Sequence, residues 1–189
     1  MRLIFLALLP SIAGLAPTAG HAQQVMPVSA FRSVELKGGG DLTIVPGAVQ
    51  RVTLLAGNNA ITHFRVRDGG KLEIETSCDS RCPHNYDLRI RIESPTVPDV
   101  AVQAGGTIAA GRGFAPQPDI AAAVSAGGTI DLRAVAAEEV SAAVHAGGDI
   151  YVHAVRALNA AVNAGGDIHY SGNPQVSMAV ANGGNVSRD

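Results

Sequence analysis

Val144-His-Ala-Gly-Gly-Asp-Ile150 and Val162-Asn-Ala-Gly-Gly-Asp-Ile168 are two copies of the short motif that decides the fold. Related copies begin at Val102, Val124 and Val180, so the five copies follow one another at steps of 22, 20, 18 and 18 residues. A motif that recurs at such steps predicts one structural unit per copy, with each unit stacked on its neighbours because no unit can bury its apolar face alone.

Apolar residues alternate with polar or small residues within each copy. Val162 and Ile168 fall on one face of an extended chain, whereas Asn163 and Asp167 fall on the other. A period of two residues indicates β-strands rather than helices. The paired glycines predict a corner between strands, because glycine adopts positive φ without steric cost.

The unit length predicts an all-β fold, a single-stranded parallel β-helix (a solenoid). A leucine-rich repeat is the second interpretation, but its Leu-x-x-Leu-x-Leu spacing is missing; an alanine-rich helical bundle is the third, and the glycine pairs argue against it. Alternating segments in the first half predict less regular strands at 33–36, 42–45, 52–56, 63–66, 72–76 and 88–93. We therefore expect one domain over 31–189, with an irregular N-terminal half (31–98) and regular rungs at 99–189.

The first 22 residues have the features of a secretory signal peptide. Met1-Arg2 precedes an apolar run from Leu3 to Leu9, and Ala22 ends a short segment of small residues that suits cleavage. A membrane anchor is the alternative, but the run is far shorter than the roughly 20 residues that span a bilayer. We expect residues 23–30 to be a linker, the mature chain to lack a membrane span, and the protein to be periplasmic or extracellular.

Charge and motifs exclude several function classes. The 14 Lys and Arg residues nearly balance the 16 Asp and Glu residues, which disfavours a nucleic-acid partner. No nucleophile motif, phosphate loop or dinucleotide fingerprint is present, so we expect no cofactor and no enzyme activity.

Several segments resemble a known family in their order along the chain. They are Phe31-Arg-Ser-Val-Glu-Leu36, Asp41-Leu-Thr-Ile44, Gly70-Lys-Leu-Glu-Ile74, Pro98-Asp-Val100 and the serial Gly-Gly-Asp-Ile motifs. This order resembles the auto-transporter adhesin head GIN domain family of secreted bacterial proteins. The resemblance implies a right-handed parallel β-helix and an exported location, and it offers no catalytic motif.

Cys78 and Cys82 are the two cysteines of the chain. In an exported protein, two cysteines four residues apart most often form a disulfide. A metal site that adds His84 is an alternative, although it lacks an evident fourth ligand; free thiols are another.

Polar and aromatic residues gather in the last motif copies. The candidates for a surface binding site are His145, Asp149, Tyr151, His153, Asp167 and His169. Aromatic and histidine side chains on a flat sheet suit a sugar or a protein partner, although a solvated surface gives the same pattern. Asp149 and Asp167 occupy equivalent positions, where they either hold a cation or hydrogen-bond the local backbone.

These observations predict an exported, non-catalytic, adhesin-like module that binds a polysaccharide or an envelope or surface protein. A glycan-active enzyme is the first alternative, with Asp131, Glu138 and Glu139 as candidate acids. A structural module that associates end to end is the second.

Overall fold

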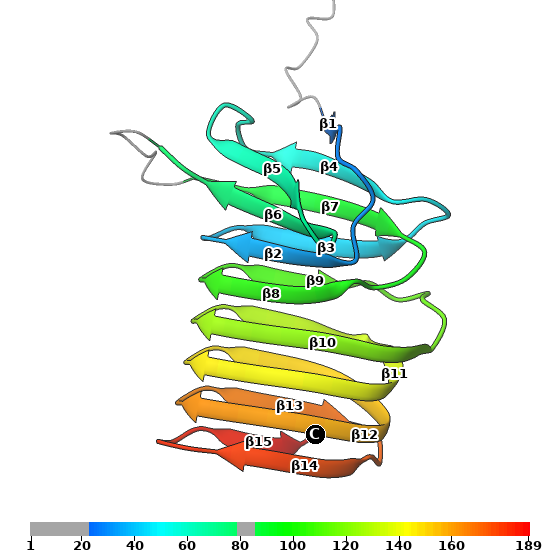
Figure 1. The fold of residues 1–189 in the computed structure, drawn as a ribbon, viewed down its shortest axis with the longest axis vertical. Coiled ribbons are helices and arrows are strands. Elements are labelled where there is room, and N and C mark those ends of the chain that lie inside the picture. The colour runs from blue at the N-terminus through cyan, green and yellow to red at the C-terminus, as the bar shows by residue number, and fades with distance from the viewer. Residues whose placement is uncertain (1–22, 79–85) are drawn as a thin grey trace, which may run out of the picture.

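The computed structural model describes residues 23–78 and 86–189, which form fifteen β-strands and no helix (Figure 1). The strands are β1 (Gln24–Met26), β2 (Ser33–Lys37), β3 (Asp41–Pro46), β4 (Arg51–Ala56), β5 (Thr62–Arg67), β6 (Lys71–Thr76), β7 (Arg89–Ser94), β8 (Asp99–Ala104), β9 (Thr107–Ala110), β10 (Gln117–Ala126), β11 (Thr129–Ala146), β12 (Asp149–Ala164), β13 (Asp167–Ser171), β14 (Gln175–Val180) and β15 (Asn185–Arg188). The six strands predicted in the first half lie at β2 to β7.

All fifteen strands belong to one sheet that folds back on itself. Hydrogen-bonded neighbours follow the order β1-β4-β7-β3-β9-β11-β10-β8-β2-β6-β5, and β12, β13, β14 and β15 continue the sheet beyond β11. Both ends of this path, β1 and β5, lie near the top of Figure 1. The sheet therefore nearly closes around a single core.

The strand directions are mixed, so the predicted parallel β-helix is wrong as a description of this fold. Strand β4 is antiparallel to both β1 and β7, and β5 is antiparallel to β6. A uniform solenoid repeat is excluded by the same pairings.

The double glycine at Gly69-Gly70 explains this error. It closes a hairpin, because Arg67 pairs with Lys71 and the Gly70 N–H donates to the Arg67 carbonyl at 3.1 Å. A short glycine-containing hairpin loop has the same sequence signature as a corner between parallel strands.

Strands β8 to β15 pair with one another in parallel, and the motif spacing sets their register. Val124 faces Val144, Val144 faces Val162, and Val162 faces Val180. Strand β11 pairs with β9 through its first residues and with β10 through its last, so it runs along both faces of the molecule. Its pairing with β12 shifts register between Asp131 and Ala136, where the chain bends.

The second glycine of each pair is required by a close approach between successive corners. Gly166 has φ +88°, and a Cβ there would lie 2.6 Å from both the Gly148 carbonyl oxygen and Val144 Cγ1. The same Gly148 carbonyl accepts a hydrogen bond from the Asp167 N–H at 3.0 Å. The corner therefore continues the backbone ladder and leaves no space for a side chain.

The core consists of aliphatic columns that run from strand to strand. Ile108, Ile130, Ile150 and Ile168 face one another in register and are fully buried. Full burial of an isoleucine side chain stabilises a fold by roughly 1.5–3 kcal/mol, so this column is a major source of stability.

Two predictions concern the residues that precede the predicted domain. Residues 23–30, interpreted as a linker, contain β1, which pairs with β4. Residues 1–22 lie outside the described residues, so the signal peptide and the domain boundaries remain predictions.

Candidate functional site

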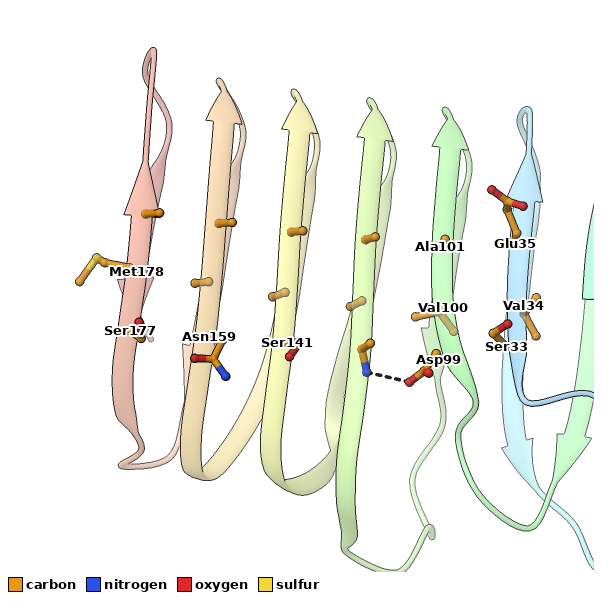
Figure 2. Close-up of a pocket in the computed structure, with 18 of the residues that line it drawn as sticks. Ser33, Val34, Glu35, Asp99, Val100, Ala101, Ser141, Asn159, Ser177 and Met178 are labelled. Atoms are coloured by element: carbon orange, nitrogen blue, oxygen red, sulfur yellow. Dashed lines mark hydrogen bonds between the residues drawn. The ribbon is translucent and has the colours of Figure 1, made fainter. Parts of the chain in front are cut away.

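A shallow hollow crosses the outer face of β2, β8, β10, β11, β12 and β14, and we call it the front trough (Figure 2). Its volume is about 680 Å³. Two rows of residues form most of its floor: Ala101, Ala123, Ala143, Ala161 and Ala179 in one row, and Asp99, Ala121, Ser141, Asn159 and Ser177 in the other. Because most of these side chains are short, the molecular surface is recessed at the centre of this face.

The alternation of side chains along each strand produces this floor. In β11, Ala142 and Val144 point into the core and are 3% and 1% exposed, whereas Ala143 points outward and is exposed. The neighbouring strands pair in register with the same alternation. An alanine row therefore runs perpendicular to the strands on the outer surface.

An ion pair between a buried carboxylate and a partly exposed lysine lies at the β2 end of the trough. Glu35 is 7% exposed, its Oε2 lies 2.8 Å from Lys71 Nζ, and its Oε1 accepts a hydrogen bond from Gln103 Nε2. The hydrogen bond and charge of Glu35 raise the pKa of Lys71 above its ordinary value. This end of the trough is fixed in position and is polar.

Next to this pair, Glu73 binds three cations. Its carboxylate lies 2.7 Å from Arg67 Nε, 3.3 Å from Lys37 Nζ and 3.5 Å from Lys71 Nζ. The hydrogen bond from Arg67 lowers the pKa of Glu73 to about 2. Met178, at the opposite end of the trough, is 59% exposed and apolar (Figure 2).

Tyr151 and His169, both candidate site residues, stack on the other face of the sheet. Their ring centroids are 4.8 Å apart with an interplanar angle of 10°. The Arg133 guanidinium lies 4.6 Å from the centre of the Tyr151 ring. Arg133 comes from β11 and His169 from β13, the strands on either side of β12, so the Tyr151 ring contacts side chains of both neighbouring strands.

Asp131 holds the Arg133 guanidinium in this arrangement. Its Oδ2 lies 2.6 Å from Arg133 Nη2, and the hydrogen bonds from Arg133 lower the pKa of Asp131. The column formed by Asp131, Tyr151 and His169, with Arg133 over it, is named the aromatic ladder. Its contacts are directed within the column, which supports a structural role.

Three strands carry the other predicted site residues: His145 lies on β11, Asp149 and His153 on β12, and Asp167 on β13. His153 Nδ1 lies 3.1 Å from Ser171 Oγ, and Asp149 faces Asp167 one strand away. His145 lies at the end of β11, before the Gly147-Gly148 corner, whereas Asp149 follows that corner. Five of the six candidates, all except His145, therefore lie at neighbouring positions of β12 and β13.

No metal-binding group is evident in the described part of the chain. Within residues 23–78 and 86–189, no three His, Cys, Asp or Glu side chains come together as they would around a metal ion. Cys82 and His84 lie outside those residues, so the predicted disulfide with Cys78 and its metal alternative remain predictions.

The front trough was missed in the sequence, although a signal for it exists. Runs such as Ala121-Ala-Ala123 and Ala142-Ala143 place alanine on both faces of a strand, and a core needs it on one face alone. Alanine at the outward positions of successive motif copies indicates a surface row of methyl groups.

Comparisons with known proteins agree with the sequence resemblance. Residues 118–174 match the family model described as "Putative auto-transporter adhesin, head GIN domain". No curated protein matches the chain. Helices long and apolar enough to cross a membrane are absent from the described residues.

Several solved structures are similar to the chain. A "putative adhesin" from Bacteroides fragilis is 18% identical over 93% of this chain and 100% of its own, with a TM-score of 0.48. A "putative cell adhesion protein" from Clostridium sporogenes is 10% identical over 88% of this chain and 99% of its own, with a TM-score of 0.38. A "putative lipid binding protein" from Parabacteroides distasonis is 14% identical over 89% and 98%, with a TM-score of 0.36.

The match in residues 118–174 confirms the resemblance of this sequence to the auto-transporter adhesin head GIN domain family.

Proposed function

We propose that this protein is an exported, non-catalytic binding module that holds an extended envelope polysaccharide in the front trough. The family match supports an adhesin-like role, and the matched residues include β11, β12 and all of β10 but its first residue, which supply the middle of the trough floor. The observation that carries the proposal is the pair of aligned rows, one apolar and one largely polar, on that floor.

The two rows suit the two kinds of surface that a sugar chain presents. The methyl groups of the alanine row pack against C–H groups, while Ser141, Asn159 and Ser177 offer hydroxyl and amide groups for hydrogen bonds. Successive strands are about 4.8 Å apart. The same pair of groups therefore recurs along the trough, as units recur along a linear polymer.

The carboxylates near the trough support binding rather than cleavage. Glycoside hydrolysis needs two carboxyl groups placed on either side of the scissile bond. Glu35 is engaged by Lys71, and Asp99 Oδ1 accepts a hydrogen bond from the Ala121 N–H at 2.9 Å. Neither carboxylate is poised over the floor as a free acid or base.

The candidate acids outside the trough are also engaged by cations. Asp131 binds Arg133, while Glu138 and Glu139 bind Arg156, with 3.9 Å between Glu138 Oε2 and Arg156 Nε. These pairs support the proposal over the alternative of a glycan-active enzyme.

A bulky residue in the trough tests the binding surface. Ala143→Phe places a ring on the floor without entering the core, since Ala143 is exposed. We expect binding to an array of envelope polysaccharides to fall at least tenfold. Ala134→Phe, at an exposed position of the same strand outside the trough, is the matched control. Equal binding by both variants contradicts the trough as the site.

A separate assay tests the absence of catalysis. The purified protein is incubated with each polysaccharide it binds, and reducing ends are measured over time. We expect no release above the buffer control. Reproducible turnover that Asp99→Asn or Glu35→Gln removes favours the enzyme instead.

Export is proposed from the predicted signal peptide, and the family match supports it. Expression of the full 189-residue sequence followed by cell fractionation and mass spectrometry tests it. We expect a chain that begins at Gln23 outside the cytoplasm, with Cys78 and Cys82 linked. An intact Met1 in the cytoplasmic fraction contradicts export.

A further inference from the structure

The charged residues that line the front trough are two acids and one base, Glu35, Asp99 and Lys71. The base is already compensated, because Lys71 Nζ lies 2.8 Å from Glu35 Oε2 and 3.5 Å from Glu73 Oε1. Asp99 forms no ion pair with any described residue, and its contact within the fold is a hydrogen bond from the backbone. Asp99 therefore supplies the uncompensated charge of the trough lining.

One carboxylate oxygen of Asp99 has a structural contact, and the other is open. Oδ1 accepts the hydrogen bond from the Ala121 N–H (Figure 2). This bond extends the pairing of β8 with β10, whose register begins one residue later, at Val100 and Ala122. Oδ2 accepts no hydrogen bond from the part of the chain that the structure describes, and Asp99 is exposed. An asparagine could accept the same structural hydrogen bond, so the negative charge itself is available to a ligand.

A hydroxyl group beside Asp99 adds a second acceptor. Ser33 of β2 faces Asp99 in register and also lines the trough. Its hydroxyl makes no hydrogen bond to another described residue. A protonated amine has three N–H donors and suits two oxygen acceptors on adjacent strands. A carboxylate or phosphate group at the same place is repelled by Asp99.

The other cations near this end of the trough do not reverse its charge. Arg67 and Lys37 bind Glu73, and neither of them lines the trough. Asp119 lies two residues before Ala121, on the same face of β10, where it is exposed and has no ion pair with the described residues. The charge that faces the floor is therefore negative.

We infer that the front trough selects an amino-sugar chain with free, protonated amines, and that Asp99 is the residue that determines this specificity. The inference rests on the proposed function, because it names the class of polysaccharide that the same trough holds. An amine of one sugar unit donates to Asp99 Oδ2 and Ser33 Oγ, while neighbouring units lie over Ala121 and Ser141. Chains rich in uronic acid or phosphate are disfavoured, since complementary charge is what distinguishes one polar ligand from another.

Two chains that differ at the amine alone test the selection. A glucosamine oligosaccharide and its N-acetylated counterpart are titrated into the protein in a calorimeter, in mildly acidic buffer that keeps the free amines protonated. We expect the wild-type protein to bind the glucosamine chain about threefold to fivefold more tightly, which is the effect of an exposed charge pair. Added salt should reduce this ratio, because it screens exposed charges.

Asp99→Asn removes the charge and keeps an oxygen that can accept the Ala121 N–H. The ratio of the two affinities should disappear in this variant, and an unchanged urea midpoint shows that the fold is intact. Asp41→Asn, at an exposed aspartate of β3 outside the trough, is the matched control and should keep the wild-type ratio. The inference is overturned if the wild-type protein binds both chains equally or binds neither. It is also overturned if the ratio persists in Asp99→Asn or disappears in Asp41→Asn as well.

Ala143→Phe separates this inference from the proposed function, because it fills the floor and leaves Asp99 in place. If both chains bind equally and both lose affinity in Ala143→Phe, the trough is the site and the selection for amines is wrong. If Ala143→Phe leaves both affinities unchanged, the trough is not the site and both proposals are wrong.

Discussion

The two halves of this sheet are stabilised in different ways, although they share one core. In residues 23–76, antiparallel pairs and ion pairs such as Glu73–Arg67 hold the outer surface. In residues 99–189, all strands pair in parallel with their motif neighbours, and glycine corners and aliphatic columns repeat. The comparison shows that the regular motif determines which residues of neighbouring strands face each other. The irregular half determines how the sheet ends.

Ile150→Ala should have the largest effect on the regular half. Ile150 is fully buried between Ile130 and Ile168, so its truncation leaves a cavity in the column. We expect the free energy of unfolding to fall by about 2–5 kcal/mol, measured by urea denaturation. Val155→Ala, at an exposed valine of the same strand, should change it by less than about 0.5 kcal/mol. Similar losses in both variants contradict the role of the column.

Gly166→Ala should be next in size. The new Cβ meets Gly148 O and Val144 Cγ1 at 2.6 Å, in a residue that already has positive φ. Steric overlap and backbone strain together should cost about 2–4 kcal/mol. Gly165→Ala is the control, since its Cβ meets no atom within 4 Å and only the strain of about 1 kcal/mol remains. A smaller loss at Gly166 than at Gly165 removes the close approach as the reason for the second glycine.

Tyr151→Leu should have a smaller effect because it removes a surface contact. The leucine keeps apolar contact but loses the stack with His169 and the cation–π contact with Arg133. We expect a loss of about 1 kcal/mol in thermal or urea unfolding. His169→Leu made in the Tyr151→Leu background should cost little more, because the stack is already absent. Additive losses argue against a coupled ladder.

Glu73 gives the irregular half a contribution to stability that depends on pH in the acidic range. The pKa of Glu73 is lowered from 4.5 to about 2. The ionised form is therefore favoured by folding, and its stabilisation is complete above pH 4.5 and is lost as the pH falls toward 2. Glu73→Gln should flatten the decline in urea midpoint between these values. An unchanged slope in the variant shows that other carboxylates cause the decline.

The motif spacing was sufficient to predict register, but not how the sheet closes. The facing of Val124, Val144 and Val162 follows from their spacing alone, because each copy offers one way to bury its valine and isoleucine. Gly69-Gly70 could not be assigned, because a hairpin loop and a parallel corner need the same permissive backbone. Longer-range packing of β5 on β6 decided between them.

The residues named from the sequence as a candidate site and those of the front trough differ in how visible they are in the sequence. The aromatic and histidine residues are conspicuous in the sequence, yet Tyr151 is in contact with His169 and Arg133. The alanines of the front trough are inconspicuous, because a single alanine does not reveal whether it faces the core or the solvent. Register between strands is what turns separate alanines into a continuous floor.

The steps from Val144 to Val162 and from Val162 to Val180 are equal, at 18 residues each. The length of the trough can therefore be changed by adding or removing whole motif copies. Insertion of one 18-residue unit leaves every facing pair elsewhere unchanged and extends the floor by one strand spacing, about 4.8 Å. Deletion of a unit shortens it by the same amount. The number of motif copies therefore sets the length of the trough.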